Sequence, residues 1–161
     1  MSSQSQPQLP PNAAIATEDV LQATTEQWFE YAVRVQPHHT DYSGTVWHGT
    51  YLTWIEEARV EYLRSVGIEF AELVKLGFCL PVIELSLCYH HFIQLGQEAL
   101  IKTRINQMTG VQINFDCRME SLNTQECYVT GAVTLVAVDC EQGKIMRHLP
   151  PTVRDALINL I

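Results

Sequence analysis

The chain has 161 residues, enough for one domain with a hydrophobic core and too few for two domains of ordinary size. Hydrophobic residues make up 47% and charged residues 17%, which excludes a disordered chain and indicates a globular protein. The formal charge of −8 would repel nucleic-acid phosphates and anionic lipids, so neither is expected as a partner.

The cysteines, at positions 79, 88, 117, 127 and 140, are five in number and form no CxxC pair. Neither a zinc ribbon nor a disulfide framework is indicated, and we expect reduced thiols in buried apolar positions. Residues 1–14 lack the basic start and apolar run of a secretion signal, and no apolar stretch approaches the ~18 residues that span a bilayer. The sequence predicts a cytoplasmic protein without a membrane span.

Residues 1–26 are rich in Ser, Gln, Pro, Thr and Ala and hold few large apolar side chains. Such a segment cannot offset the entropy lost on ordering, so we expect a flexible N-terminal tail, with a short helix over 18–26 as the alternative. Residues 27–161 then form a single domain.

The elements of that domain follow from hydrophobic periodicity. Alternation over 29–35 predicts a strand with one buried face, and helical spacing from Trp47 to Tyr62, ended by Gly67, predicts a helix of about 18 to 20 residues. The remaining expected elements are a helical turn within 68–77, strands at 83–89, 99–105 and 111–119, a central strand covered on both faces at 127–138, a short strand after residue 144, and a small helix from Pro150. One long helix with an antiparallel meander is best buried when the sheet curls around the helix, which gives an α+β fold.

The segment TDYSGTVWHGTYLTWIEEAR, residues 40–59, resembles the signature of the hot-dog-fold acyl-CoA thioesterases of the 4-hydroxybenzoyl-CoA thioesterase type, including the branch associated with the bacterial Tol-Pal cluster. That signature has the form T-D-x-x-G-x-V-x-H-x-x-Y-L-x-x-x-E-x-A-R, and every fixed position is met. The element order extends the resemblance from about residue 28 to 160. It implies a hot-dog fold, in which a curved antiparallel sheet of five to six strands wraps the helix, and hydrolysis of acyl-CoA thioesters without a cofactor.

Two departures from the family pattern lie beside the site. His39 stands where family members commonly carry a second acid, and Ser43 stands where many have alanine or glycine. The change at Ser43 is mild, whereas His39 and Tyr42 alter the polarity beside the site, which affects the substrate class and the pKa of Asp41 rather than the chemistry.

Thioester hydrolysis needs a group that attacks or activates water, and donors aimed where negative charge develops on oxygen. The first turn of a helix leaves backbone N–H groups unpaired and carries about half a positive charge. Gly44 allows a tight turn from strand to helix, so Asp41 can lie beside that N-terminus. We assign Asp41 as nucleophile or general base, the backbone N–H near His48 as oxyanion donor, and the His48 side chain as a positioning group. The substrate-binding candidates are Trp47, Gly44, Tyr51 and Arg59.

The same residues also have purely structural interpretations. Asp41 can cap a turn, and His48 can be a hydrogen-bonded core histidine. Trp47 and Trp54 are interpreted as core residues. Arg59 falls on the apolar side of the helix, where an unpaired charge is costly, so we expect it to pair with Glu56 or with an acid on a second subunit.

Metal binding and cysteine catalysis are both disfavoured. The group His38, His39, Asp41 and His48 matches no zinc spacing, so no metal is expected. No cysteine lies in the motif, which argues against a cysteine nucleophile.

The resemblance also implies partners. It places the site across a homodimer interface, with dimers able to pair into tetramers, and acyl-CoA as substrate, while acyl-carrier-protein thioesters stay open. The CoA phosphates would need basic residues at the mouth of the cleft, and those available are Lys102, Arg104, Arg118, Lys144 and Arg147.

Two other functions of hot-dog domains are alternatives. A non-catalytic hot-dog module that binds acyl groups or docks a carrier protein would release no thiol from acyl-CoA. A hot-dog hydratase uses an acid and a histidine about five positions apart in a D-x-N-x-x-H pattern, whereas Asp41 and His48 are seven apart.

Overall fold

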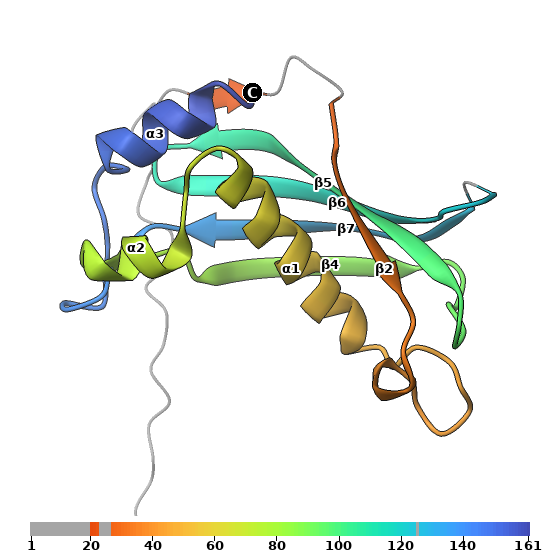
Figure 1. Ribbon diagram of the computed structural model, residues 1–161. Coiled ribbons are helices and arrows are strands. Elements are labelled where there is room, and N and C mark those ends of the chain that lie inside the picture. The colour runs from red at the N-terminus through yellow and green to blue at the C-terminus, as the bar shows by residue number, and fades with distance from the viewer. Residues whose placement is uncertain (1–19, 23–26, 125) are drawn as a thin grey trace, which may run out of the picture.

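One long helix crosses the inner face of a curved antiparallel sheet in the computed structural model, which describes residues 20–22, 27–124 and 126–161 (Figure 1). The strand order is β1-β5-β6-β7-β4, and β2 also pairs with β5. This arrangement confirms the predicted hot-dog fold. The sheet has six strands, the larger of the two predicted numbers. The strands are β1 Val20–Gln22, β2 Phe29–Arg34, β4 Val82–Tyr89, β5 Glu98–Thr109, β6 Gln112–Ser121 and β7 Cys127–Val136.

The helix α1, Thr50–Ser65, has 16 residues and begins three residues later than the periodicity predicted. Residues 47–49 form a turn, in which the Thr50 N–H donates to the Trp47 carbonyl (2.9 Å). At the far end the chain leaves the helix at Gly67, whose φ of 86° is a conformation that glycine adopts most easily. Trp47 therefore lies outside the helix, and its side chain is 51% exposed, so the interpretation of Trp47 as a core residue is wrong.

The core forms between one side of α1 and the inner face of the sheet. Strand alternation selects the inner side chains: β6 alternates half-buried and buried residues along most of its length, as its sequence predicted. Each large side chain removed from water there contributes about 1.5–3 kcal/mol. The largest fully buried side chains include Trp54, Tyr51, Phe115, Leu63, Ile101, Ile105 and Ile113.

The N-terminal segment departs from the sequence expectation. Val20–Gln22 form β1, which pairs with residues 107–109 of β5, so they belong neither to a helix over 18–26 nor to a tail separate from the domain. The predicted tail otherwise lies outside the described residues.

Residues 127–138 were expected to be one central strand covered on both faces. The strand β7 is interior, between β6 and β4, but its outer-face residues Thr130, Ala132 and Thr134 are exposed or half-buried. The segment then breaks, and β8, Val138–Asp139, joins a second small sheet of order β3-β8-β9. The remaining elements are α2 Phe70–Lys75, β3 Phe78–Cys79, β9 Lys144–Ile145 and α3 Pro151–Ile158 at this end of the molecule, and η1 Pro37–His39 near the start of α1 at the other end.

The cysteines are free, but they are not uniformly buried as predicted. Cys117 is buried in the core, and burial raises the pKa of its thiol to about 12. Cys88 and Cys140 are exposed. No helix within the described part of the chain combines the length and apolar composition needed to cross a membrane.

The edge strand β4 has a close neighbour at Gly131 of β7. A Cβ atom at position 131 would overlap the Leu87 side chain and lie 2.5 Å from the Ser86 carbonyl oxygen. Because backbone cannot move aside without separating the strands, Gly131→Ala is expected to lower the free energy of unfolding by about 1–3 kcal/mol in urea denaturation. The matched control Ala132→Ser, at an exposed neighbouring position, should change it by less than about 0.5 kcal/mol. Equal stability of the two variants would contradict the close approach.

Candidate active site

The signature motif folds as a turn attached to the start of α1. A β-bridge joins Thr40 to Val46 and closes the turn, while the His39 carbonyl accepts hydrogen bonds from the Trp47 N–H (2.9 Å) and the Thr50 hydroxyl (3.0 Å). Gly44 has a φ of 79°, as its role in a tight turn predicted. Asp41 and the first residues of the helix are therefore held in one local unit.

One oxygen of the Asp41 carboxylate is fully engaged within this turn. Its Oδ1 accepts bonds from the Ser43 hydroxyl (2.6 Å), the Ser43 N–H (2.8 Å) and the Thr45 N–H (3.3 Å). The Ser43 hydroxyl, then the Ser43 N–H, and least the Thr45 N–H lower the pKa of Asp41 below its usual value, against an opposing effect of burial. The acid thus caps the turn, as the structural interpretation predicted. It is also an ionised carboxylate whose Oδ2 accepts no bond from the described residues.

The Ser43 hydroxyl offers a test through pH. A kcat/KM that requires the Asp41 carboxylate falls as the pH drops through its pKa, so a lowered pKa keeps the enzyme active at lower pH. Ser43→Ala removes the largest stabilising contact, and the acidic limb of the kcat/KM profile should move to higher pH. The control Ser65→Ala removes a hydroxyl that bonds only the Tyr62 carbonyl, and it should leave the limb in place. An unmoved limb in Ser43→Ala would assign that limb to another group.

The start of α1 presents donors without partners. Within the described part of the chain, the backbone N–H groups of His48 and Gly49 donate no hydrogen bond. The Trp47 indole lies against Gly49, where a Cβ would overlap its ring, and it meets the exposed His48 ring at a tilt of 49° with centroids 4.8 Å apart. The absence of a side chain at Gly49 therefore lets the Trp47 ring pack against the start of the helix. His48 is not a core histidine.

Tyr89 was missed by the sequence reasoning. Its hydroxyl donates to the His48 carbonyl (3.0 Å), and its ring contacts the Tyr51 ring edge-to-face with centroids 5.2 Å apart. Tyr89 lies on β4, 41 positions after His48, so only the fold reveals the contact. The sequence indicated only that the Tyr89 side chain faces the inner side of its strand.

Two of the substrate-binding candidates lie deeper in the molecule. Tyr51 is buried, and its hydroxyl accepts the Ile93 N–H (3.2 Å), which ties the helix to the loop between β4 and β5. Arg59 is 6% exposed and lies nine residues past Thr50, about 14 Å along the helix axis, so the fold does not bring it beside Asp41. Burial lowers the pKa of Arg59, against the opposing charge of Glu56.

Among the described residues, Arg59 has no counter-charge in contact. Its Nε is buried without a hydrogen-bond partner, and the described residues provide no ion pair for it. The expected contact with Glu56 is therefore not formed within the chain. The alternative, an acid on a second subunit, stays a prediction.

His39, two positions before Asp41, takes a defined protonation state. Its Nδ1 accepts the Gln36 N–H (2.9 Å), which requires an unprotonated nitrogen, and its ring meets Trp54 edge-to-face at 5.1 Å. Burial, then the neighbouring His38, lower the pKa of His39. Among the described residues no group of three or more His, Cys, Asp or Glu side chains is arranged to hold a metal ion.

A hot-dog domain whose motif loop holds an ionised acid and leads into a helix that starts with free amides defines a class of protein, and comparison with known proteins supports that class. The family model described as "Thioesterase superfamily" matches residues 43–128. The Synechocystis protein named "Putative esterase sll0410" is 53% identical over 164 residues, covering 99% of both chains. "Acyl-CoA thioester hydrolase YbgC" of Escherichia coli is 29% identical over 126 residues, covering 78% of this chain and 92% of that protein.

A solved thioesterase structure has a similar fold. Slr0204, a 1,4-dihydroxy-2-naphthoyl-CoA thioesterase from Synechocystis, superposes with a TM-score of 0.77 at 21% identity, covering 83% of this chain and 98% of that one. The chain therefore belongs to the thioesterase superfamily, a class of thioester hydrolases.

Proposed function

We propose that the protein hydrolyses acyl-CoA thioesters, with Asp41 as nucleophile or general base and the backbone N–H groups of His48 and Gly49 as the oxyanion hole. One observation carries the proposal: an ionised carboxylate with a free oxygen and two unpaired amides at a helix start belong to the same hydrogen-bonded loop. The named activity of the relatives, including YbgC, supports it.

The helix start would polarise the substrate. A thioester carbonyl oxygen that accepts the His48 and Gly49 N–H groups would gain charge during attack, and the positive end of α1 stabilises that charge. One preorganised donor of this kind is worth about 3 kcal/mol, or about a hundredfold in rate. The Tyr89 hydroxyl donates to the His48 carbonyl, which belongs to the same peptide group as the Gly49 N–H. This bond therefore fixes the orientation of the Gly49 N–H.

Asp41 would supply the attack. Its Oδ2 either adds to the carbonyl carbon, giving an anhydride that water then hydrolyses, or removes a proton from an attacking water. In both routes the carbon–sulfur bond breaks and CoA leaves as a thiolate, which needs little help from an acid because thiols ionise near pH 8.5. The exposed Trp47 ring is proposed to cover the reacting group.

The edge strand β4 supports assembly as a homodimer, or as a tetramer built from dimers. Within the described sheet its outer edge pairs with no strand, and several of its apolar side chains are exposed although they face the inner side. An apolar unpaired edge is a template for a second copy of the same strand. The exposed side chains are Val82 (45%), Ile83 (51%), Leu85 (43%) and Tyr89 (40%).

A kinetic panel tests the activity. Purified protein, incubated with benzoyl-, hydroxynaphthoyl-, medium-chain and long-chain acyl-CoA and a chromogenic thiol reagent, should release free CoA from at least one class at a rate proportional to enzyme. The same panel presented on an acyl carrier protein compares the two carriers. Protein that binds acyl-CoA in calorimetry yet releases no thiol would replace the proposal by the acyl-binding module.

A further inference from the structure

Two of the five free cysteines lie on neighbouring strands of the small sheet. Cys79 is the last residue of β3, and Cys140 directly follows β8. The two strands are antiparallel, and Phe78 lies opposite Asp139. The ladder continues one step further, because the Cys140 N–H donates to the Gly77 carbonyl (2.9 Å). Cys140 therefore lies opposite the residue two positions before Cys79.

This register brings the two thiols to the same face of the ladder. Side chains two positions apart in a strand point to the same side, and Gly77 has no side chain that could stand between the two cysteines. The thiols are in contact: the interaction with the Cys79 side chain, then desolvation, raises the pKa of Cys140. The fold thus brings together two thiols that are far apart in the sequence.

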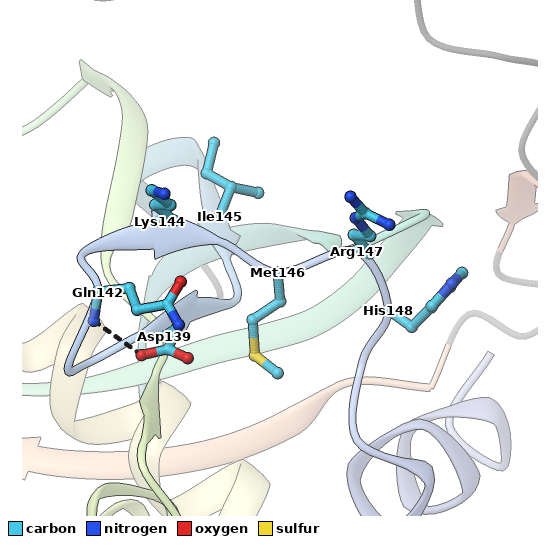
Figure 2. A pocket seen from close by; sticks show the side chains of 7 residues that line it. All are labelled: Asp139, Gln142, Lys144, Ile145, Met146, Arg147 and His148. Atoms are coloured by element: carbon cyan, nitrogen blue, oxygen red, sulfur yellow. Dashed lines mark hydrogen bonds between the residues drawn. The ribbon is translucent and has the colours of Figure 1, made fainter.

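The turn that carries Cys140 is held by its own hydrogen bonds. The Asp139 Oδ1 accepts the N–H groups of Glu141 and Gln142, each at 2.9 Å, and the bond to Gln142 is drawn in Figure 2. Asp139 and Gln142 also line a cavity of about 520 Å³ that is open to solvent (Figure 2). Cys140 is exposed and Cys79 is half-buried, so a dissolved small molecule reaches the pair from the Cys140 side.

Metal binding does not account for the pair. A protein zinc site takes at least three protein ligands. Among the described residues no group of three or more His, Cys, Asp or Glu side chains is arranged to hold a metal ion, so the two thiols lack a third ligand. Oxidation to a disulfide is the chemistry that two accessible thiols in contact share.

Formation of that bond needs a small shift, which this end of the ladder can provide. Diagonal neighbours on one face of an antiparallel pair have Cα atoms about 7–8 Å apart, and a disulfide spans about 4.4–6.8 Å. The two segments must therefore approach by roughly 1 Å. Because β3 and β8 have only two residues each and Cys140 lies beyond the end of its strand, few hydrogen bonds resist this movement.

We propose that Cys79 and Cys140 form a reversible oxidation site, at which a small-molecule disulfide of the glutathione type converts the two thiols into one intrachain disulfide. The Cys140 thiol loses its proton, and its thiolate attacks one sulfur of glutathione disulfide, so that a mixed disulfide forms and one glutathione thiolate leaves. The Cys79 thiolate then attacks the Cys140 sulfur, and the second glutathione leaves. Two protein thiols are oxidised, one small disulfide is reduced to two thiols, and both protons pass to the departing glutathione molecules.

The bond acts on the stability of the fold and not on the active site. It closes a loop of about 60 residues, which contains β4, β5, β6 and β7, and thereby removes entropy from the unfolded chain. Asp41 lies in the loop before α1, whereas the small sheet lies near the other end of this helix (Figure 1). Oxidation should therefore raise the melting temperature and leave thioester hydrolysis unchanged.

Mapping of the disulfide tests its formation. The folded protein is incubated without oxygen in buffers of increasing glutathione disulfide, quenched with acid, and treated under denaturing conditions with a maleimide that counts free thiols. The reduced protein should bind five maleimides, and the oxidised protein two fewer, with a cross-linked peptide that contains Cys79 and Cys140 in a protein that runs as a single chain on a non-reducing gel. Cys140→Ser should lose the cross-link.

The matched control is Cys88→Ser, which removes another exposed thiol and should keep the cross-link. A wild type that retains five free thiols at the most oxidising glutathione ratio would overturn the proposal. So would cross-links that form only between chains, or a Cys140→Ser protein that still loses two free thiols within one chain.

Melting temperature and activity test what the bond does. The oxidised wild type should melt at least about 5 °C above the reduced protein, and dithiothreitol should abolish the difference. Cys140→Ser should melt at one temperature in both buffers, and kcat/KM of the wild type should be the same in both forms. An oxidised form that melts no higher, or a reversible change of kcat/KM on oxidation, would refute this role. A protein inactive on every thioester would refute the proposed function alone, since neither the mapping nor the melting temperature needs a substrate.

Discussion

Asp41→Asn is expected to abolish nearly all thioester hydrolysis, with kcat lower by about 10³-fold, because the amide can neither attack the carbonyl nor take a proton from water. The substitution keeps an oxygen that can accept the Ser43 and Thr45 N–H bonds, so the turn should persist. Activity is measured as thiol released from the best acyl-CoA of the panel, with the circular dichroism spectrum and melting temperature as checks on folding.

A matched acid elsewhere controls for the loss of charge. Asp155 is exposed on α3, at the opposite end of the molecule from the motif, and Asp155→Asn should retain wild-type kcat. Asp41→Asn with more than a tenth of the wild-type kcat would move the attacking group elsewhere. The exposed helix acids Glu56 and Glu57 would then be the first carboxylates to test.

Leu85→Lys is expected to separate the subunits and to lower kcat/KM by about a hundredfold. Leu85 is 43% exposed on the inner face of β4, at the middle of the unpaired edge, and a second copy would bury it. An ammonium group left there without a partner costs several kcal/mol, and each 1.4 kcal/mol is a factor of ten in association. Light scattering on the purified protein gives the mass, and the thiol assay gives the activity.

Leu122→Lys is the matched control, because Leu122 has the same exposed fraction, 43%, but lies in the turn between β6 and β7. It should keep both the wild-type mass and the wild-type kcat/KM. A Leu85→Lys protein that keeps its mass would place the interface elsewhere. Monomers with full activity would refute a site that needs two subunits.

The parts of the fold that could be predicted are those with local causes. The alternation of β6 and of β2 is set by which side chains face the core, so their faces were read correctly from the sequence. The glycine turn at position 44 and the end of α1 at Gly67 follow from backbone sterics at single residues.

The parts that could not be predicted depend on distant neighbours. Trp47 fits the helical period of α1, but the chain enters the helix through a turn held by the His39 carbonyl, which leaves the indole at the surface. The sequence of Val20–Gln22 has too little apolar surface for a strand to be predicted there. These residues become a strand because they pair with the edge of β5. The break of β7 at residue 137 depends on pairing with β3 across the fold.

The site was predicted only in part, for a similar reason. The motif gave Asp41, Gly44 and the helix start, because these residues are close in the sequence. The Tyr89 contact and the packing of Trp47 against Gly49 depend on how β4 and the indole ring lie in space. The roles of Tyr51 and Arg59 in substrate binding stay predictions.

The position of β4 in the sheet has a consequence for how the chain matures during synthesis. Leu85 pairs with Val133, and two complete strands, β5 and β6, lie between them in the sequence. As the polypeptide leaves the ribosome, β4 therefore emerges before β7 is made, and both of its edges are unpaired during that time. Pairing of β4 with β7 must then close a long loop, which is entropically costly. A nascent chain would be most prone to aggregate in this interval, and slower translation downstream of residue 89 would lengthen it.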